Sequence, residues 1–379
     1  MYPIPFNKPY LGGATADAVR AALSGGRLSG DGPVCKKVEE RLRNLFGLRH
    51  VLLTTSCTHA LEMACMLLRL KPGDEVVLPS FTFVSTANAI LRAGATPVFC
   101  DIDERTLTID LEDAERRVSG RTRAIIAVHY AGVAADMDRL RALAARLNAA
   151  LIEDAAQGVN ARYKGAFLGG IGDMGAYSFH DTKNYVAGEG GALILNDEQR
   201  ARAAEIVREK GTNRANFLRG EVDKYTWVAP GSSYILSDLL AAVLDSQLDL
   251  LDEIQEKRRA IHRRYMDELA PLVRRESLRL PDIPPDRDSN YHIFHLLLRD
   301  ERERNRVMDA MKKRGVQTTF HYVPLHSSPF ARQTLGTEGL SLPVTDRVAS
   351  SLLRLPIYPG LTGEEQTVVI ESLFSCFPR

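Results

Sequence analysis

One lysine stands out among the residues of this chain that could carry chemistry. Lys183 lies in the segment Ser178–Asn184, directly after an apolar run, and Gly188, Gly190 and Gly191 follow it closely. A lysine amine acts as a nucleophile when burial or a neighbouring cation lets it lose its proton near neutral pH. Lys183 is therefore the candidate anchor for a carbonyl cofactor. The alternative is an ordinary exposed lysine in a loop, since most lysines are exposed.

A carboxylate ends another apolar run upstream of this lysine. The run Ala150–Ile152 reads as a short strand and is followed by Glu153 and Asp154. Open α/β sheets bind ligands at the carboxyl ends of their strands, which is where Asp154 would lie. A carboxylate there can pair with the protonated ring nitrogen of pyridoxal 5'-phosphate (PLP) and keep the ring an electron sink. The alternative is that Asp154 caps a following helix.

A third segment could bind a phosphate group. The segment Val51–Glu62 reads as a strand, a turn of small residues and an amphipathic helix. The free amides and the dipole of a helix N-terminus suit a phosphate. Ser178, at the end of its own strand, could add a hydroxyl group. The alternative is that the Ser and Thr residues only cap the helix.

An aromatic residue follows a fourth apolar run. Phe83 lies shortly after the predicted strand Val76–Leu78. An aromatic ring at a strand end can stack on a cofactor ring, with an offset contact of about 0.5–1.5 kcal/mol. The alternative is that Phe83 belongs to the hydrophobic core.

These four segments need a scaffold that brings strand ends together. From Val51 to Asn196 apolar runs alternate with helical patterns such as Met137–Leu147, which predicts a mostly parallel sheet covered by helices, an α/β fold. Besides the strand that opens the segment Val51–Glu62, the predicted strands are Val76–Leu78, Pro97–Phe99, Ala124–Val128, Ala150–Ile152, Ala176–Phe179 and Ala192–Leu195.

The C-terminal part predicts a smaller α/β domain. Glu198–Lys210 and Ser237–Leu269 read as long helices, the second leading out of the large domain. Beyond it, the predicted elements are a strand at His292–Leu298, a helix at Arg302–Arg314 and a strand at Gln317–His321. We therefore expect a large domain over residues 1–250, including the N-terminal segment, and a small domain over residues 251–379.

Composition limits the classes of partner. The chain has 379 residues, 45% of them hydrophobic, enough for a large core, and a formal net charge of +1 gives no reason to expect a nucleic-acid or membrane partner. The basic residues at 257–259 and 263–264 are typical of a solvated helix face. No run approaches the length and apolarity of a membrane span or a signal peptide.

The cysteines predict neither disulfides nor a metal site. There are five, an odd number, and they are scattered without metal-ligand spacing. We expect a reduced cytoplasmic protein that binds no metal.

Taken together and in this order, the segments resemble the fold-type-I PLP-dependent aminotransferases, and within them the sugar-nucleotide aminotransferases. The resemblance covers essentially the whole chain. The segments that carry it are Pro5–Asn7, Gly30–Pro33, Thr54–Thr58, Pro79–Ala89, Val128–Ala134, Ser178–Asn184, Glu209–Arg214, Asp223–Trp227, Gly231–Tyr234, His321–His326 and Leu353–Pro356.

The resemblance implies roles around the cofactor. Lys183 would bind PLP covalently and also serve as the general acid and base, and Asp154 would contact the pyridine nitrogen. Gln157 would lie near the ring hydroxyl group and Phe83 would stack on the ring. The positions that match the phosphate site are Cys57, Thr58 and Ser178, together with Ser233. Many relatives carry an asparagine at the position of Ser233 that reaches the partner subunit's phosphate, so the serine puts that contact in doubt.

Substrate-contacting residues are implied less directly. His180 lies beside the anchor lysine, and His321 and His326 belong to a segment that the family places near the active site. Each could instead be satisfied by a backbone hydrogen bond. By resemblance Tyr225 and Trp227 line the nucleotide side of the site, and the alternative is a plain aromatic packing cluster.

The resemblance also implies a reaction. The branch it favours transfers the amino group of L-glutamate to C4 of dTDP-4-keto-6-deoxy-D-glucose and forms dTDP-4-amino-4,6-dideoxy-D-galactose and 2-oxoglutarate, for surface polysaccharide such as lipopolysaccharide. Another keto-sugar, amination at C3 or the opposite stereochemistry at C4 stays open, and so does a catalytically silent sugar-nucleotide sensor. The family implies a homodimer with active sites between the subunits.

Overall fold

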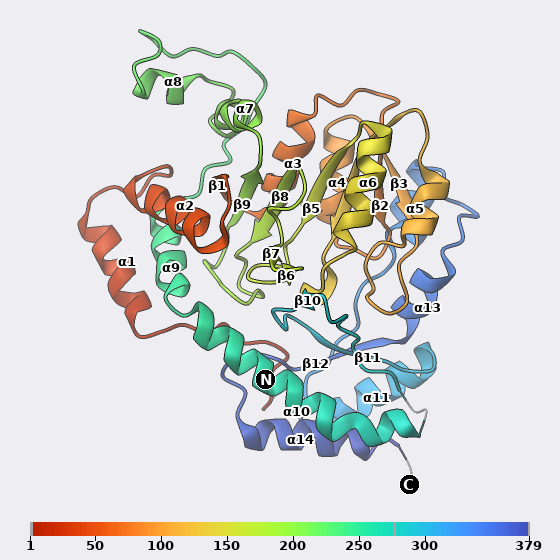
Figure 1. Cartoon of the computed structure of the whole chain (residues 1–379). Coiled ribbons are helices and arrows are strands. Elements are labelled where there is room, and N and C mark those ends of the chain that lie inside the picture. The colour runs from red at the N-terminus through yellow and green to blue at the C-terminus, as the bar shows by residue number, and fades with distance from the viewer. Residues whose placement is uncertain (1–2, 276–277, 378–379) are drawn as a thin grey trace.

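A seven-stranded sheet forms the centre of the computed structural model, which describes residues 3–275 and 278–377 (Figure 1). The strand order is β1-β9-β8-β5-β4-β2-β3, and β8, β5, β4, β2 and β3 run parallel while β9 is antiparallel to both its neighbours. The strands are β1 (His50–Thr54), β2 (Glu75–Pro79), β3 (Thr96–Cys100), β4 (Thr122–Val128), β5 (Ala150–Asp154), β8 (Met174–Ser178) and β9 (Gly191–Leu195).

Helices cover both faces of this sheet, so its strands read as continuous apolar runs. Alternate side chains of one strand enter two separate cores, as Leu151 and Ile152 of β5 do. One core is closed by α2 (Pro33–Phe46), α5 (Leu111–Arg117), α6 (Met137–Leu147) and α9 (Asp238–Leu248), and the other by α3 (Cys57–Leu67), α4 (Val84–Arg92) and α7 (Glu198–Arg208).

A second layer lies beside the carboxyl ends of the parallel strands. Its sheet is the antiparallel pair β11 (Phe294–Leu297) and β12 (Leu352–Leu355). The helices α10 (Leu251–Arg274), α11 (Glu301–Lys313) and α14 (Gly363–Phe374) pack around a core of their own (Figure 1). Ile4 is part of that core and pairs with Val316, so the start of the N-terminal segment packs with this layer. The division into two domains near residue 250 stays a prediction.

The remaining elements are short or peripheral. α8 projects away from the body of the molecule (Figure 1). The elements are α1 (Ala14–Ser24), α8 (Arg214–Leu218), α12 (Pro329–Thr334), α13 (Pro343–Ser351), the 3-10 turns η1 (Tyr130–Gly132) and η2 (Leu325–Ser327), and the strands β6 (Arg162–Tyr163), β7 (Ala166–Phe167) and β10 (Arg287–Asp288).

The structure confirms the predicted strands of the large sheet and corrects three other expectations. The helix expected over Ser237–Leu269 is two helices, α9 and α10, separated at residues 249–250. The segment expected as a strand at Gln317–His321 makes only an isolated bridge, between Thr319 and Arg354. The basic face expected at 257–264 is not wholly solvated, because Arg258 is buried and donates to the carbonyl groups of Tyr291, His292 and Ile357.

All five cysteines are free and buried. Within the described ranges, the structure contains no helix with the length and apolar character that crossing a membrane requires.

Candidate active site

A cavity of about 680 Å³ opens between the carboxyl ends of the large sheet's strands and the small sheet. The carboxyl ends of parallel strands lie at the same edge of a sheet, so segments that are distant in the sequence meet at this cavity. Nine of the residues singled out from the sequence line the cavity: Cys57, Thr58, Phe83, Asp154, Gln157, Ser178, His180, Lys183 and His321.

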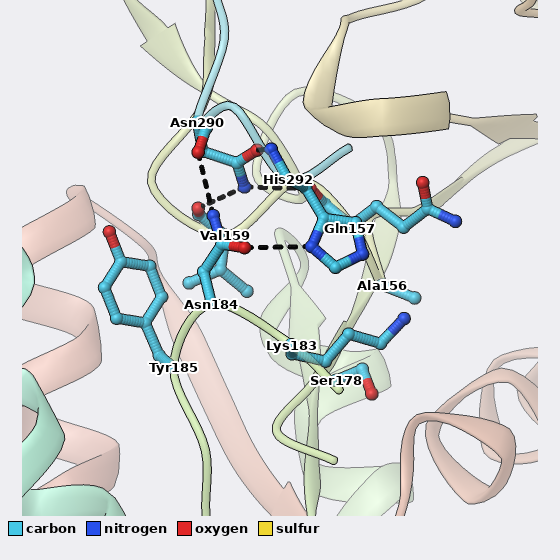
Figure 2. Close-up of a pocket in the computed structure, with 9 residues that line it drawn as sticks. All are labelled: Ala156, Gln157, Val159, Ser178, Lys183, Asn184, Tyr185, Asn290 and His292. Carbon is cyan, nitrogen blue, oxygen red and sulfur yellow. Dashed lines mark hydrogen bonds between the residues drawn. The ribbon is translucent and has the colours of Figure 1, made fainter. Parts of the chain in front are cut away.

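Lys183 is held by a tight loop between β8 and β9. The loop is closed by backbone bonds from the Phe179 amide to the Gly190 carbonyl at 2.9 Å and from the Lys183 amide to the His180 carbonyl at 2.9 Å. The side chain lies in the cavity beside Ser178 (Figure 2). Burial lowers the pKa of the Lys183 amine, so the neutral, nucleophilic form is favoured over that of an exposed lysine. Lys183 is therefore not an ordinary exposed lysine in a loop, which was the alternative interpretation.

Asp154 ends β5 with its side chain at the cavity wall. Thr86 Oγ1 donates to Asp154 Oδ2 at 2.7 Å, and the Ala156 amide donates to Oδ1 at 3.2 Å. No helix follows, so the alternative of a helix cap is wrong. The carboxylate is nearly buried without a basic partner in the described residues, and it can therefore stabilise a positive charge on a bound ring.

Gln157 is fixed from both ends of its amide. Its Oε1 accepts from the Ala131 amide at 2.7 Å, and its Nε2 donates to the Tyr322 hydroxyl at 3.0 Å. This links the loop after β5 to the segment 318–324 of the second layer. Tyr322, which the sequence reasoning did not single out, lies in the same aromatic cluster as Phe83 and Tyr130.

The N-terminus of α3 forms another wall. Ser56 caps the helix by accepting from the His59 amide, and Cys57, Thr58 and the buried Ser178 line the cavity beside it. The helix cap, which was the alternative interpretation of these Ser and Thr residues, is therefore present. The start of the helix also faces the cavity. Gly191 of β9 lies so close to Ser56 and Cys57 that a Cβ atom would overlap their backbone.

Phe83 was expected either to stack on a cofactor or to belong to the hydrophobic core. Its side chain is 58% exposed and lines the cavity, so it is not a core residue. The ring is available to stack on a planar ligand.

His292 is a cavity residue that the sequence reasoning missed. Asn184 Nδ2 donates to the Asn290 carbonyl at 2.8 Å, which leaves Asn184 Oδ1 as the acceptor facing His292 Nδ1 at 2.9 Å (Figure 2). An acceptor there requires the proton on Nδ1. Burial lowers the pKa of His292 well below its usual value, so the ring is neutral and presents an unprotonated Nε2.

The two predicted histidines that line the cavity, His180 and His321, differ in setting. His180 lies at the mouth, with its ring nitrogens 3.0 Å from Asp181 Oδ1 and 3.6 Å from Glu189 Oε1. His321 lies deeper, with Nδ1 3.1 Å from the Tyr130 hydroxyl, and burial lowers its pKa. Their expected role as substrate contacts stays a prediction.

Four predicted residues do not line this cavity in their own chain, and their expected roles stay predictions. His326 is 2% exposed and is bound between Ser80 Oγ at 2.8 Å and Asp346 Oδ1 at 3.4 Å. Ser233 is exposed on a bridge to Glu209. Tyr225 and Trp227, 53% and 76% exposed, lie on the projecting segment with α8. Trp227 is thus not in a packed cluster, whereas Tyr225 contacts the Phe217 ring.

Arg354, at the small sheet, is another cavity residue that was missed. Its segment was quoted for resemblance, but no role was given to the arginine. An arginine inside the apolar run 352–357 was the available signal, because charged residues are seldom placed in a buried strand without a partner.

The cavity has what PLP requires. It offers an amine of lowered pKa in Lys183, a buried carboxylate in Asp154, a helix N-terminus with a serine hydroxyl for a phosphate, and an open aromatic face in Phe83. These residues fit PLP, because its aldehyde, ring nitrogen, phosphate and ring face each have a matching partner in the cavity.

Comparison with known proteins also identifies a PLP-dependent aminotransferase. Residues 9–374 match the DegT/DnrJ/EryC1/StrS aminotransferase family. The aminotransferase TlmJ from Streptoalloteichus hindustanus is similar at 32% identity and a TM-score of 0.90, covering 98% of both chains.

Two sugar aminotransferases are also similar over nearly their whole length. The PLP form of the putative sugar aminotransferase Spr1654 from Streptococcus pneumoniae has 26% identity and a TM-score of 0.90, covering 99% of this chain and 98% of that chain. CalS13 from Micromonospora echinospora has 28% identity and a TM-score of 0.90, covering 99% of this chain and 100% of that chain. These likenesses confirm the predicted α/β fold.

Proposed function

The chain belongs to the DegT/DnrJ/EryC1/StrS aminotransferase family, and we propose that it transfers an amino group from L-glutamate to C4 of dTDP-4-keto-6-deoxy-D-glucose. The products are 2-oxoglutarate and dTDP-4-amino-4,6-dideoxy-D-galactose, a building block for surface polysaccharide. The observation that carries the proposal is the convergence of Lys183, Asp154 and the N-terminus of α3 on one cavity.

Membership in the family confirms two expectations. The protein is an aminotransferase of the class that acts on sugars, and its cofactor is pyridoxal 5'-phosphate. The nucleotide, the position of the keto group and the stereochemistry of the product belong to the proposal.

When bound, PLP supplies an electron sink for the carbanion formed at the amino-bearing carbon. Lys183 Nζ would hold the cofactor covalently between turnovers. Asp154 would keep the ring nitrogen protonated through its negative charge, and Thr86 holds that carboxylate in place at 2.7 Å. Cys57, Thr58 and Ser178 would bind the phosphate, with the Cys57 contribution coming from its backbone amide. Burial raises the pKa of the Cys57 thiol, so the thiol stays neutral.

Once free, the Lys183 amine would move a proton to and from the reacting carbon. Its lowered pKa keeps it available as a base, and its loop anchors it within reach of Asp154 and Ser178 in the same cavity. Phe83 and the Gln157–Tyr322 pair would hold the plane of the bound ring.

Tyr225, Trp227 and Ser233 would act on a partner subunit. They lie outside their own chain's cavity, on or beside the projecting segment, and a homodimer would bring them to the cavity of the second copy. Two large exposed aromatic residues are a typical feature of such an interface.

The first test is the identity of the product. The PLP-loaded protein is incubated with L-glutamate and dTDP-4-keto-6-deoxy-D-glucose, and the product is analysed by NMR. We expect an axial amine at C4. An equatorial C4 amine or a C3 amine would keep the enzyme class and change the substrate assignment, whereas binding of the keto-sugar without any amine formation would support a sensor.

The second part of this test concerns the anchor. Lys183→Ala is expected to remove the visible absorbance of the lysine-bound cofactor and to lower turnover by at least about 10⁴-fold, because one group serves as nucleophile and as base. Lys210→Ala is the matched control, since that lysine is exposed and pairs with Glu209. Turnover that survives in Lys183→Ala would remove the basis of the proposal.

A further inference from the structure

His326 fastens the 3-10 turn η2 to a strand end of the large sheet. Ser80 follows β2, and its Oγ lies 2.8 Å from His326 Nδ1. The same Oγ accepts from the His326 amide at 3.0 Å, and the Leu325 amide donates to the Ser80 carbonyl at 3.0 Å. Both Ser80 and His326 are buried. These hydrogen bonds therefore hold η2 against the carboxyl end of β2.

The second ring nitrogen of His326 decides which atom of the pair donates. Nε2 lies 3.4 Å from Asp346 Oδ1 on α13, and a carboxylate only accepts hydrogen bonds. Burial lowers the pKa of His326, although the carboxylates of Asp346 and Asp101 oppose this shift, so the ring is neutral and has one N–H group. That proton lies on Nε2. Ser80 Oγ therefore donates to an unprotonated Nδ1.

Ser, His and Asp in this arrangement are also the residues of the serine hydrolase triad, in which a serine hydroxyl attacks a substrate carbonyl. Ser80 cannot serve in that way, because it is fully buried and its Oγ already accepts from the His326 amide. The three residues are therefore suited to holding two segments together and not to attacking a substrate.

Each of these two segments carries an aromatic residue of the cavity wall. Phe83 follows Ser80 closely in the sequence and lines the cavity. Tyr322 precedes His326 closely and also lines the cavity, where its hydroxyl accepts from Gln157 Nε2 at 3.0 Å. The centres of the Phe83 and Tyr322 rings lie 6.4 Å apart. The bonds between Ser80 and His326 thus join the segments that bring these two rings together.

Phe81 fills the space between the segments. Its side chain is fully buried, with the ring centre 5.5 Å from that of Tyr322 and 5.1 Å from that of Tyr130. Protein interiors are close-packed, so a displacement of Ser80 must move the Phe81 ring or leave a gap beside it. The position of Ser80 is therefore coupled to the wall that Phe83 and Tyr322 form.

We propose that Ser80 and His326 are positioning residues for the cofactor ring, because their hydrogen bond fixes Phe83 relative to Tyr322. The inference rests on the stacking role that the proposed function gives to Phe83. Neither Ser80 nor His326 lines the cavity, so both act through Phe83. This role of His326 differs from the substrate contact expected from the sequence.

The experiment is a double-mutant cycle measured by PLP affinity. Cofactor-free protein is titrated with PLP, and the visible absorbance of the lysine-bound cofactor is followed. Ser80→Ala is expected to weaken PLP binding about tenfold, the effect of losing one hydrogen bond and leaving a buried acceptor unpaired. In a Phe83→Leu background the same substitution should change PLP affinity less than about twofold, because the ring through which Ser80 acts is absent.

Two substitutions of His326 separate its two side-chain contacts. His326→Asn places an amide oxygen near the position of Nδ1 and can keep the bond to Ser80. His326→Gln reaches the position of Nε2 and can keep only the contact with Asp346. We expect PLP affinity within about threefold of the wild type for His326→Asn and about tenfold weaker for His326→Gln. The matched control is Ser327→Ala, which should change nothing, because this hydroxyl donates to the Pro324 carbonyl within its own segment.

The outcomes separate this inference from its premise. An equal loss from Ser80→Ala in both backgrounds would show an effect on the fold as a whole and would overturn the inference. Unchanged PLP affinity in Ser80→Ala, or a larger loss in His326→Asn than in His326→Gln, would also overturn it. If Phe83→Leu alone leaves PLP affinity unchanged, the stacking role of Phe83 is wrong as well.

Hydrogen exchange in the wild type tests the same coupling without a variant. The Leu325 and His326 amides both bond to Ser80, and their exchange, followed by NMR, should slow at least about threefold when PLP binds and fixes Phe83. The Ser328 amide is the reference, because it bonds to the Leu325 carbonyl at 3.2 Å. Exchange that does not change, or that slows equally at all of these amides, would contradict the coupling.

Discussion

At the scale of single residues, the cavity depends on polar groups whose orientation is set by amides and carbonyls. The Asn290 carbonyl orients the Asn184 side chain, and Asn184 in turn fixes the tautomer of His292 (Figure 2). The consequence is a neutral imidazole whose free Nε2 can only accept a hydrogen bond. This places an acceptor in the same cavity as the Lys183 amine without adding a charge.

The tautomer of His292 can be tested directly. We expect ¹⁵N NMR of histidine-labelled protein to show His292 neutral and protonated on Nδ1, because Asn184 Oδ1 is an acceptor. Asn184→Leu should shift the ring toward the form protonated on Nε2 and lower turnover about tenfold, the cost of one lost hydrogen bond. The His180 signals, at the cavity mouth, serve as the internal reference. A wild-type ring protonated on Nε2 would contradict the assignment.

At the scale of elements, the cavity wall at the N-terminus of α3 depends on a strand and a helix end that approach each other closely. β9 runs against the N-terminus of α3, and only a residue without a side chain at Gly191 permits this approach, since a Cβ would overlap the backbone of Ser56 and Cys57. Backbone cannot yield as a flexible side chain can, so a substitution must move the helix start.

Two neighbouring glycines provide a matched test of this packing. Gly191→Ala should weaken PLP affinity at least tenfold and destabilise the fold by about 1–3 kcal/mol, the usual cost of overpacking. Gly190→Ala should change PLP affinity less than about threefold, because its nearest neighbours are side-chain atoms at 3.4 to 3.7 Å. PLP titration by absorbance and urea unfolding measure the two quantities, and equal effects of the two substitutions would show that the close approach does not shape the site.

The elements also show what the sequence could and could not predict. Strands that are buried on both faces are continuous apolar runs in the sequence. For this reason β4 and β5 could be predicted from the sequence, together with the strand end that carries Asp154. The break between α9 and α10 has no proline to mark it, and the helical pattern continues across it. Arg354 and His292 reach the cavity only through the packing of the small layer, which no local pattern encodes.

At the scale of the whole molecule, the second layer places a group of neutral histidines next to the cavity. Burial lowers the pKa of His262 to about 4 and of His295 to about 3, and it also lowers the pKa values of His292 and His321. The rings of His262, His295 and His321 pack against Tyr130, Tyr291 or Phe294, and the His292 ring contacts Asn184. Folding therefore keeps four histidines unprotonated that would take up protons in the unfolded chain.

Stability should consequently fall as the pH falls below about 6.5, the value at which unfolded histidines become protonated. Between that pH and the lowered folded-state values, the unfolded chain binds more protons, and each such histidine contributes a slope of up to about 1.4 kcal/mol per pH unit. The stability is fully present above this window. Urea unfolding of the wild type and of His262→Phe is measured between about pH 4.5 and about pH 8, a range that spans the usual histidine pKa. The slope of stability against pH should be shallower for the variant. Phe294→Leu, its non-titrating neighbour, should lower stability equally at every pH. A wild-type slope that His262→Phe leaves unchanged would show that this ring is already protonated in the folded protein.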